Sequence, residues 1–180
     1  AYEYLRLGER LAPELMRFLS VIADRACDVW REPDAGIWEV RGGHRHFVYS
    51  KLMVWVALDR AVTMSEKYGL TGDVHRWERE REEVCAAILS EGYDPGVGAF
   101  VQSFGSKDLD AANLLIPVVE FLPPDDPRVQ GTIDRTLERL TENGVVYRYL
   151  NEDGLPGGEG GRQHKTHRGN RGNSVHFGSP

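Results

Sequence analysis

A tryptophan followed directly by a glutamate, Trp38-Glu39, is the pair in this sequence best suited to acid catalysis. The pair lies between two predicted turns, at residues 33–36 and at residues 42–43. An indole can stack on the apolar face of a pyranose and lower the local dielectric constant. This raises the pKa of an adjacent carboxyl group toward the working pH of a general acid. The pair therefore suits protonation of the leaving oxygen of a sugar.

The residues after this loop predict a buried helix that would anchor it. Residues 52–58 are apolar on every face of a helix, which is typical of a buried helix. The pair alone, however, fits a second interpretation equally simply, in which a packed indole stands beside a solvated carboxylate. Two residues by themselves favour that interpretation, so the assignment depends on the surrounding sequence.

The surrounding sequence resembles a known family over a long stretch. DAGIWEVRG (34–42) and RHFVYSKLM (45–53) resemble the general-acid segment of glycoside hydrolase family 15, the family of glucoamylases, glucodextranases and bacterial trehalases. The resemblance continues in order from about residue 30 to residue 160, and it is greatest to the branch that includes the trehalases. The further motifs are GAFVQSFGS (98–106), LDA (109–111), FLPPDDPRV (121–129), YRY (147–149) and GLPGGEG (154–160).

The resemblance assigns roles to three residues. Glu39 matches the general acid, which protonates the glycosidic oxygen as its bond to the anomeric carbon breaks. Trp38 would border the sugar, and Arg148 resembles the arginine that grips it. For Arg148 the alternative is a structural ion pair with Glu152 or Asp153.

Two further cations near the pair, Arg41 and Lys51, could donate charge-assisted hydrogen bonds to sugar hydroxyls. Salt bridges to neighbouring acids are the equal alternative. Glu159 lies in a glycine-flanked loop and is the natural second carboxylate, which an inverting glycosidase needs roughly 6.5–9.5 Å from its acid. The resemblance places the general base further along, in an acidic segment that this sequence lacks. We therefore interpret Glu159 as a substrate-site residue and expect the base to be missing.

Hydrophobic periodicity predicts five helices whose burial alternates. Long glycine-rich joins at 32–46, 91–108 and 141–160 alternate with short ones, so the long joins should share one rim of an antiparallel array. The pattern fits two concentric rings of helices, and the resemblance implies an all-α, partial (α/α)6 barrel. The predicted helices are 13–31 (peripheral), 47–68 (internal), 72–90 (peripheral), 109–122 (internal, kinked at Pro117) and 127–140 (peripheral).

Composition and charge limit the kinds of molecule that the chain is expected to bind. The net charge is −6, and residues 1–160 carry 18 basic against 28 acidic side chains, which argues against binding to nucleic acid. No apolar run approaches a membrane span. Cys27 and Cys85 fit two reduced core thiols of a cytoplasmic protein. Two groups of histidines, His44 with His46 and His164, His167 and His176 in the tail, predict no designed metal site, and the expected chemistry needs no cofactor.

The sequence predicts two parts. Residues 1–160 form a partial glycosidase catalytic domain, and residues 161–180 form a basic tail without apolar periodicity, which should be disordered. The chain begins at Ala1, so it has the character of a fragment. An internal helix is expected where the tail stands, and we interpret the tail as a frame error or a premature end.

Three functions remain open at this point. The first is a fragment of an inverting α-glucosidic hydrolase that releases glucose from trehalose or α-glucans, with Glu39 as its acid. The second is a helical-ring carbohydrate-binding piece without catalysis, and the third is an inactive truncated product. Because the base is missing, we expect hydrolysis from the parent protein and little from this chain alone. The sequence does not decide whether the substrate is trehalose or maltodextrin. It also leaves open the oligomeric state and whether the chain folds on its own.

Overall fold

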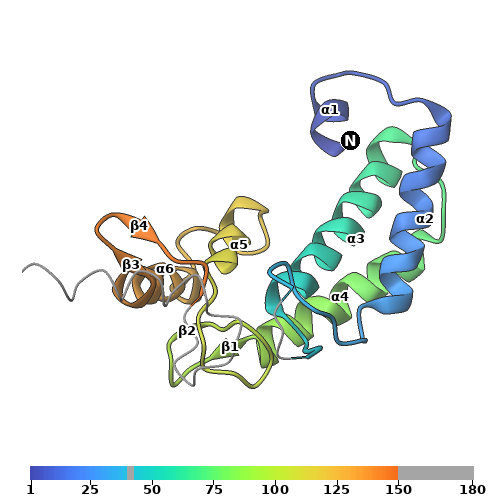
Figure 1. Cartoon of the computed structure of the whole chain (residues 1–180). Helices are drawn as coiled ribbons and strands as arrows, with labels where there is room; N and C mark the ends of the chain where they lie inside the picture. The colour runs from blue at the N-terminus through green and yellow to red at the C-terminus, as the bar shows by residue number, and fades with distance from the viewer. Residues whose placement is uncertain (40–42, 150–180) are drawn as a thin grey trace, which may run out of the picture.

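The computed structural model describes residues 1–39 and 43–149 and is mostly helical (Figure 1). Within these residues six α-helices follow one another, and a short 3-10 helix at Ala111–Leu114 precedes the fifth. The α-helices are α1 (Tyr2–Arg6), α2 (Pro13–Val29), α3 (Val48–Tyr68), α4 (Val74–Glu91), α5 (Leu115–Val118) and α6 (Pro127–Leu140).

Local signals explain where the long helices begin and end. α2 and α6 begin at Pro13 and Pro127, whose missing N–H is not needed in the first turn. The Asp73 carboxylate accepts a hydrogen bond from the Arg76 amide at 3.1 Å and caps α4. α3 ends at Gly69, which has a φ of +74°. The helices predicted at 13–31, 47–68, 72–90 and 127–140 are confirmed within two residues at each end.

α3 is the central helix, as its apolar composition predicts. From Val48 to Ser65 none of its side chains is exposed, and α2 and α4 both pack against it (Figure 1). α4 keeps a mostly charged outer face, whereas α2 also exposes apolar side chains, among them Phe18 and Val21. α3 is nevertheless the buried helix of the three and α2 and α4 lie against it, as the predicted alternation requires.

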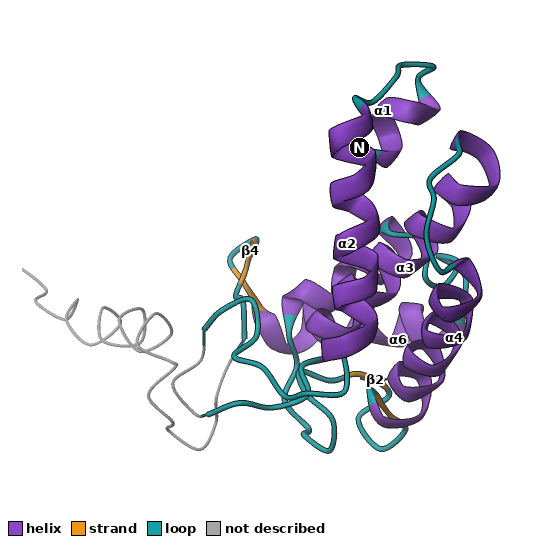
Figure 2. Cartoon of the chain, turned by 90° about the vertical axis from the view of Figure 1, so that its right-hand side faces the viewer, coloured by secondary structure: helices purple, strands orange, loops and turns teal. Residues whose placement is uncertain are grey.

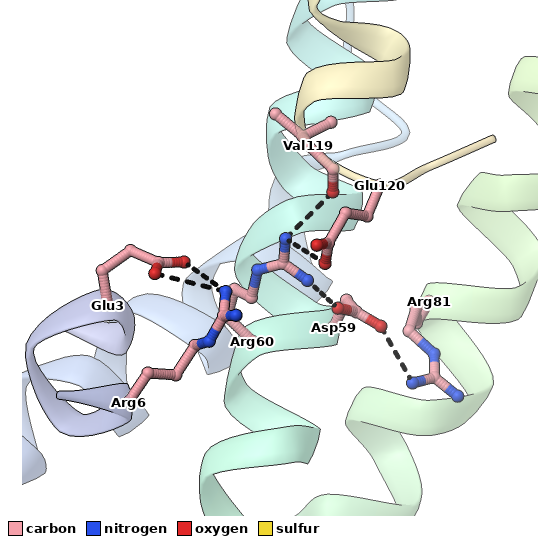
Figure 3. A network of polar contacts seen from close by, with 7 residues as sticks. All are labelled: Glu3, Arg6, Asp59, Arg60, Arg81, Val119 and Glu120. Carbon is pink, nitrogen blue, oxygen red and sulfur yellow. Dashed lines mark hydrogen bonds and ion pairs between the residues drawn. The ribbon is translucent and has the colours of Figure 1, made fainter. Parts of the chain in front are cut away.

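A polar network ties α3 to its neighbours. The Arg60 guanidinium donates to the Val119 carbonyl oxygen at 2.9 Å and to Asp59 at 2.6 Å. Asp59 in turn accepts from Arg81 of α4 at 3.3 Å (Figure 3). The Arg60 guanidinium also lies 4.7 Å from the centre of the Tyr2 ring. One residue of α3 therefore contacts α1 and the end of α5, and its neighbour contacts α4.

The internal helix predicted at 109–122 is wrong in its extent. The structure has the 3-10 helix at Ala111–Leu114 and a single α-helical turn, α5. Glu120 adopts a left-handed φ of +65°, which ends the helix there, and Pro117 has no N–H to extend an α-helical hydrogen-bond ladder. Ile116 is buried, but Val118 is 70% exposed. The segment is thus a turn with one buried anchor, and α1 was not predicted.

Two short antiparallel hairpins lie in the connections. β1 (Tyr93–Asp94) pairs with β2 (Ala99–Phe100), and β3 (Thr141–Glu142) pairs with β4 (Val145–Val146). α6 holds the first hairpin closely, because the Phe100 amide donates to the Thr132 hydroxyl at 2.9 Å.

The three long connections meet at one end of the helices. The Val48 amide donates to the Gln102 carbonyl oxygen at 3.0 Å, and the Ala111 amide donates to the Arg148 carbonyl oxygen at 2.9 Å. Figure 2 shows these connections as teal loops gathered at the lower end of the helices. The common rim is therefore confirmed for the described parts of the connections. No helix in the described ranges is long and apolar enough to cross a membrane.

Candidate functional site

The loop that carries Trp38 and Glu39 is closed at its base by Asp34. Its backbone and that of Arg45 exchange two hydrogen bonds of 2.9 Å. Its carboxylate accepts from the Gly36 amide at 2.7 Å and from the Ser50 hydroxyl at 2.6 Å. The loop is thereby fixed to the first turn of α3.

Lys51 lies beneath this loop. It is 2% exposed, and its Nζ donates to the Glu32 carbonyl oxygen at 2.7 Å. Asp34 Oδ2 stands 3.8 Å away. Burial lowers the pKa of Lys51, and the nearby Asp34 charge opposes that change. The geometry favours an anchoring role for Lys51, and its predicted contact with a sugar hydroxyl stays a prediction.

Trp38 is half-buried and held from two sides. Its Nε1 donates to both carboxylate oxygens of Asp110, at 3.0 and 3.1 Å. The Arg148 guanidinium carbon lies 5.2 Å from the centre of the Trp38 ring, within the range of a cation–π contact. The structure therefore brings together two residues that the sequence analysis selected separately.

Asp110 is the residue that sequence reasoning missed. It is 3% exposed, and its Oδ1 also accepts from the Ala112 amide at 2.8 Å. Burial raises the pKa of Asp110, and hydrogen bonds from Trp38, Ala112 and Gln102 oppose the rise. The Gln102 contact is the weakest of these, because within the described residues its Nε2 makes no well-aligned hydrogen bond. The only sequence feature that pointed to Asp110 was the motif LDA (109–111), for which the sequence analysis gave no chemical role.

Glu39 is exposed at the rim. Its φ is +47°, in the left-handed region, and its amide donates to the Gly36 carbonyl oxygen at 3.3 Å. Among residues 1–39 and 43–149, no cation forms a salt bridge with its carboxylate. The side chain of Glu39, which follows Trp38 in the chain, is therefore exposed to solvent and is not held in an ion pair within these residues.

The amino-acid sequence matches one protein family along most of its length. The model of "Glycosyl hydrolases family 15" matches residues 1–166. The chain belongs to glycosyl hydrolase family 15. It is 43% identical to the trehalase of Mycobacterium tuberculosis over 162 residues, which cover 88% of this chain and 24% of that protein. It is 40% identical to the trehalase of Thermoplasma acidophilum over 133 residues, which cover 73% and 23%. The chain thus spans about a quarter of the length of these trehalases.

Solved structures show the same fold. A glycosidase variant in complex with glucose aligns with a TM-score of 0.61 at 21% identity, over 70% of this chain and 33% of that one. The wild-type glycosidase aligns with a TM-score of 0.60 at 20% identity, over the same shares of the two chains. At these identities the likeness shows that the chain shares part of the fold of these glycosidases.

Several predicted features of this family 15 chain lie outside the described residues. They include Arg41, Glu159, the alternative ion-pair partners of Arg148, and the tail at 161–180. Their roles stay predictions, and the position of a general base is not part of the described geometry. Within the described residues, no group of three His, Cys, Asp or Glu side chains could hold a metal ion.

One buried thiol and two hollows in the described part of the chain do not include Trp38 or Glu39. Burial raises the pKa of the Cys27 thiol to about 11, so this cysteine is a poor nucleophile at neutral pH. A hollow of about 420 Å³ is lined by residues such as Lys107 and Arg139. A second one, of about 530 Å³, lies between α1 and α2. Neither of these two hollows is lined by Trp38 or Glu39.

Proposed function

We propose that this chain supplies the acid-bearing part of the active site of an inverting α-glucosidic hydrolase that releases glucose. The observation that carries the proposal is the placement of Trp38 and Glu39. The indole is held between Asp110 and Arg148 where the three long connections meet, and the carboxyl group beside it is exposed.

In this mechanism Glu39 protonates the glycosidic oxygen while the bond to the anomeric carbon breaks. Trp38 offers an apolar face to the sugar ring, and Arg148 lies where it can donate to sugar hydroxyls. A second carboxylate, roughly 6.5–9.5 Å from the acid, activates the water that attacks the opposite face. We place that base in a segment beyond the described residues, consistent with a chain that spans a quarter of its relatives.

Trehalose is the favoured substrate. The proposal is supported by identities of 43% and 40% to two trehalases over most of this chain. A solved relative of the same fold is a glycosidase in complex with glucose, the product that trehalose hydrolysis releases. We further propose that α2, α3, α4 and α6 are members of the double ring of an (α/α)6 barrel.

The test grafts this chain into the M. tuberculosis trehalase in place of the 162 aligned residues. We expect Glu39→Gln to lower kcat by about 10²–10⁴-fold, the usual contribution of a general acid, with little change in KM. Glu82→Gln, an exposed glutamate of α4, is the matched control and should leave kcat unchanged. If Glu39→Gln keeps full activity, Glu39 is not the acid. A graft that binds trehalose with Glu39 intact but does not hydrolyse it would favour the non-catalytic alternative.

The ungrafted chain provides a second test. We expect no release of glucose from trehalose or maltose, because an acid without an activated water does not complete the displacement. Robust turnover that is abolished by Glu159→Gln would show that the base lies within this chain.

A further inference from the structure

Indole–carboxylate hydrogen bonds recur in this structure, and two of them belong to the helical scaffold. Trp77 Nε1 donates to Asp24 at 2.8 Å, and Trp30 Nε1 donates to Glu80 at 2.8 Å. Both bonds join α2, with the residue that follows it, to α4. They show what such a pair does when its role is structural: it locks two packed helices together.

The third bond is placed differently. Trp38 and Asp110 both lie in connections at the rim, 72 residues apart in the chain. We propose, on the basis of the function proposed above, that Asp110 is a positioning residue of this site. It holds the indole of Trp38 and thereby fixes the orientation of Glu39.

Asp110 stands where the three connections converge. Its side chain accepts hydrogen bonds from Trp38 of the first connection and from the Ala112 amide in the first turn of the 3-10 helix. The next residue, Ala111, donates its amide to the Arg148 carbonyl oxygen at 2.9 Å. Arg148 in turn lies over the Trp38 ring. The carboxylate thus orients the edge of the indole while the backbone beside it orients the cation on the indole's face.

The environment of Asp110 differs from that of the scaffold carboxylates. Glu80 has Arg31 at 2.7 Å as a cationic partner. Asp110 is buried, and no cation in the described ranges forms a salt bridge with it, so its hydrogen bonds offset only part of the desolvation cost of its ionised form. A buried carboxylate that lowers stability is easier to explain by what it positions than by what it stabilises.

Glu39 needs such support. A left-handed φ at a non-glycine residue persists only where neighbouring contacts hold it, and Glu39 has a φ of +47°. The adjacent Trp38 is tied to Asp110, and within the described residues the direct hydrogen bond of Glu39 is the one to Gly36, at 3.3 Å. Loss of the Asp110 carboxylate therefore frees the residue that carries the acid.

The first experiment measures kcat and KM for trehalose in the grafted trehalase. We expect Asp110→Ala to lower kcat about 100-fold, the cost of a misplaced catalytic group, with KM changed only slightly. Asp110→Asn keeps an oxygen acceptor for the indole and should restore most of kcat. The matched control is Asp24→Ala, which removes the partner of Trp77 and should lower stability without lowering kcat of the folded enzyme.

A double-mutant cycle separates this inference from the function itself. If Asp110 acts through the indole N–H, Asp110→Ala should have little further effect on kcat in a Trp38→Phe background. Fully additive effects would overturn the positioning role. If Asp110→Ala leaves kcat intact while Glu39→Gln abolishes it, the positioning role fails and the proposed function stands. If Glu39→Gln is active, the proposed function fails.

A second measurement on the ungrafted chain uses the indole and backbone N–H resonances. Asp110→Ala should shift the Trp38 indole resonance and the Glu39 amide resonance and leave the Trp30 and Trp77 indoles in place. If the Trp38 and Glu39 resonances stay unchanged, Asp110 does not control them and the inference is wrong. This test does not depend on whether the graft is active.

Discussion

The ammonium group of Lys51 lies 2.7 Å from the carbonyl oxygen of Glu32, beneath the loop that carries Trp38 and Glu39. A buried cation is therefore a structural tie between the first turn of α3 and the start of the loop. The sequence alone suggested a sugar-binding cation at this position, because a lysine in a conspicuous motif is compatible with both roles. The bond to Glu32 makes the anchoring role directly testable.

We predict that Lys51→Met lowers the free energy of unfolding by about 1–3 kcal/mol at neutral pH, because the Glu32 carbonyl loses its donor. Burial lowers the pKa of Lys51 below its ordinary 10.5. Between the lowered pKa of the folded state and the ordinary value of 10.5, the unfolded chain binds more protons than the folded chain. The free energy of unfolding of the wild type therefore increases as pH rises through that interval. Lys51→Met should lack this gain. Urea unfolding at several pH values measures both effects.

The control for this variant is Lys67→Met, at an exposed position in the last turn of the same helix. It should change the free energy of unfolding by less than about 0.5 kcal/mol. Equal effects of the two substitutions would contradict the anchoring role of Lys51.

Asp110 gives the opposite pH dependence. Burial raises its pKa above the ordinary 3.8, so between 3.8 and the folded-state value the folded chain binds more protons than the unfolded chain. The associated stability is fully present below 3.8 and is lost as pH rises through the folded-state pKa. We predict that Asp110→Asn gains stability relative to wild type as the pH increases across this window. A difference that is constant with pH, measured by urea unfolding, would refute this.

The contrast between Lys51 and Asp110 shows what local patterns reveal. The long helices were predictable because caps, prolines and apolar periodicity act over a few residues. Asp110 escaped prediction because its partner is 72 residues away. Lys51 carried a usable signal, since it follows Val48 by three residues and precedes Leu52 and therefore lies on the buried side of α3. The segment 109–122 misled because its apolar content does not reveal the left-handed Glu120 that stops the helix.

Glu39 leads to a prediction about strain. A left-handed conformation costs an L-residue about 1–2 kcal/mol, whereas glycine adopts it freely but loses more entropy on folding. We predict that Glu39→Gly raises the free energy of unfolding relative to Glu39→Ala by up to about 1 kcal/mol. Both variants lack the carboxyl group, so the comparison isolates the backbone. Asn143, with a φ of +52° in the β3–β4 turn, is a second site where the glycine variant should have a higher free energy of unfolding than the alanine variant. Identical stabilities of the two Glu39 variants would show that its backbone is unstrained.

The last prediction concerns how α6 holds the rim. A Cβ added at Gly131 would stand 2.3 Å from the Gly98 carbonyl oxygen, a backbone atom that cannot swing aside. The next residue of α6, Thr132, accepts a hydrogen bond from the Phe100 amide, so this part of α6 sets the position of the β1–β2 hairpin. We predict that Gly131→Ala lowers the free energy of unfolding by about 1–3 kcal/mol, the usual cost of overpacking.

The control for Gly131→Ala is Gly96→Ala, whose Cβ would meet only the side chain of Asp94 at 3.1 Å. That carboxylate oxygen accepts from the Val97 amide at 2.8 Å, but a side chain shifts more easily than the Gly98 backbone. Gly96→Ala should therefore lower the free energy of unfolding less than Gly131→Ala does, as measured by urea unfolding. Because the hairpin leads through Gln102 to the first residue of α3, Gly131→Ala should also shift the Val48 amide resonance. A stable Gly131→Ala chain with an unchanged Val48 resonance would show that α6 and the hairpin are not in rigid contact, and the rim would then need another support.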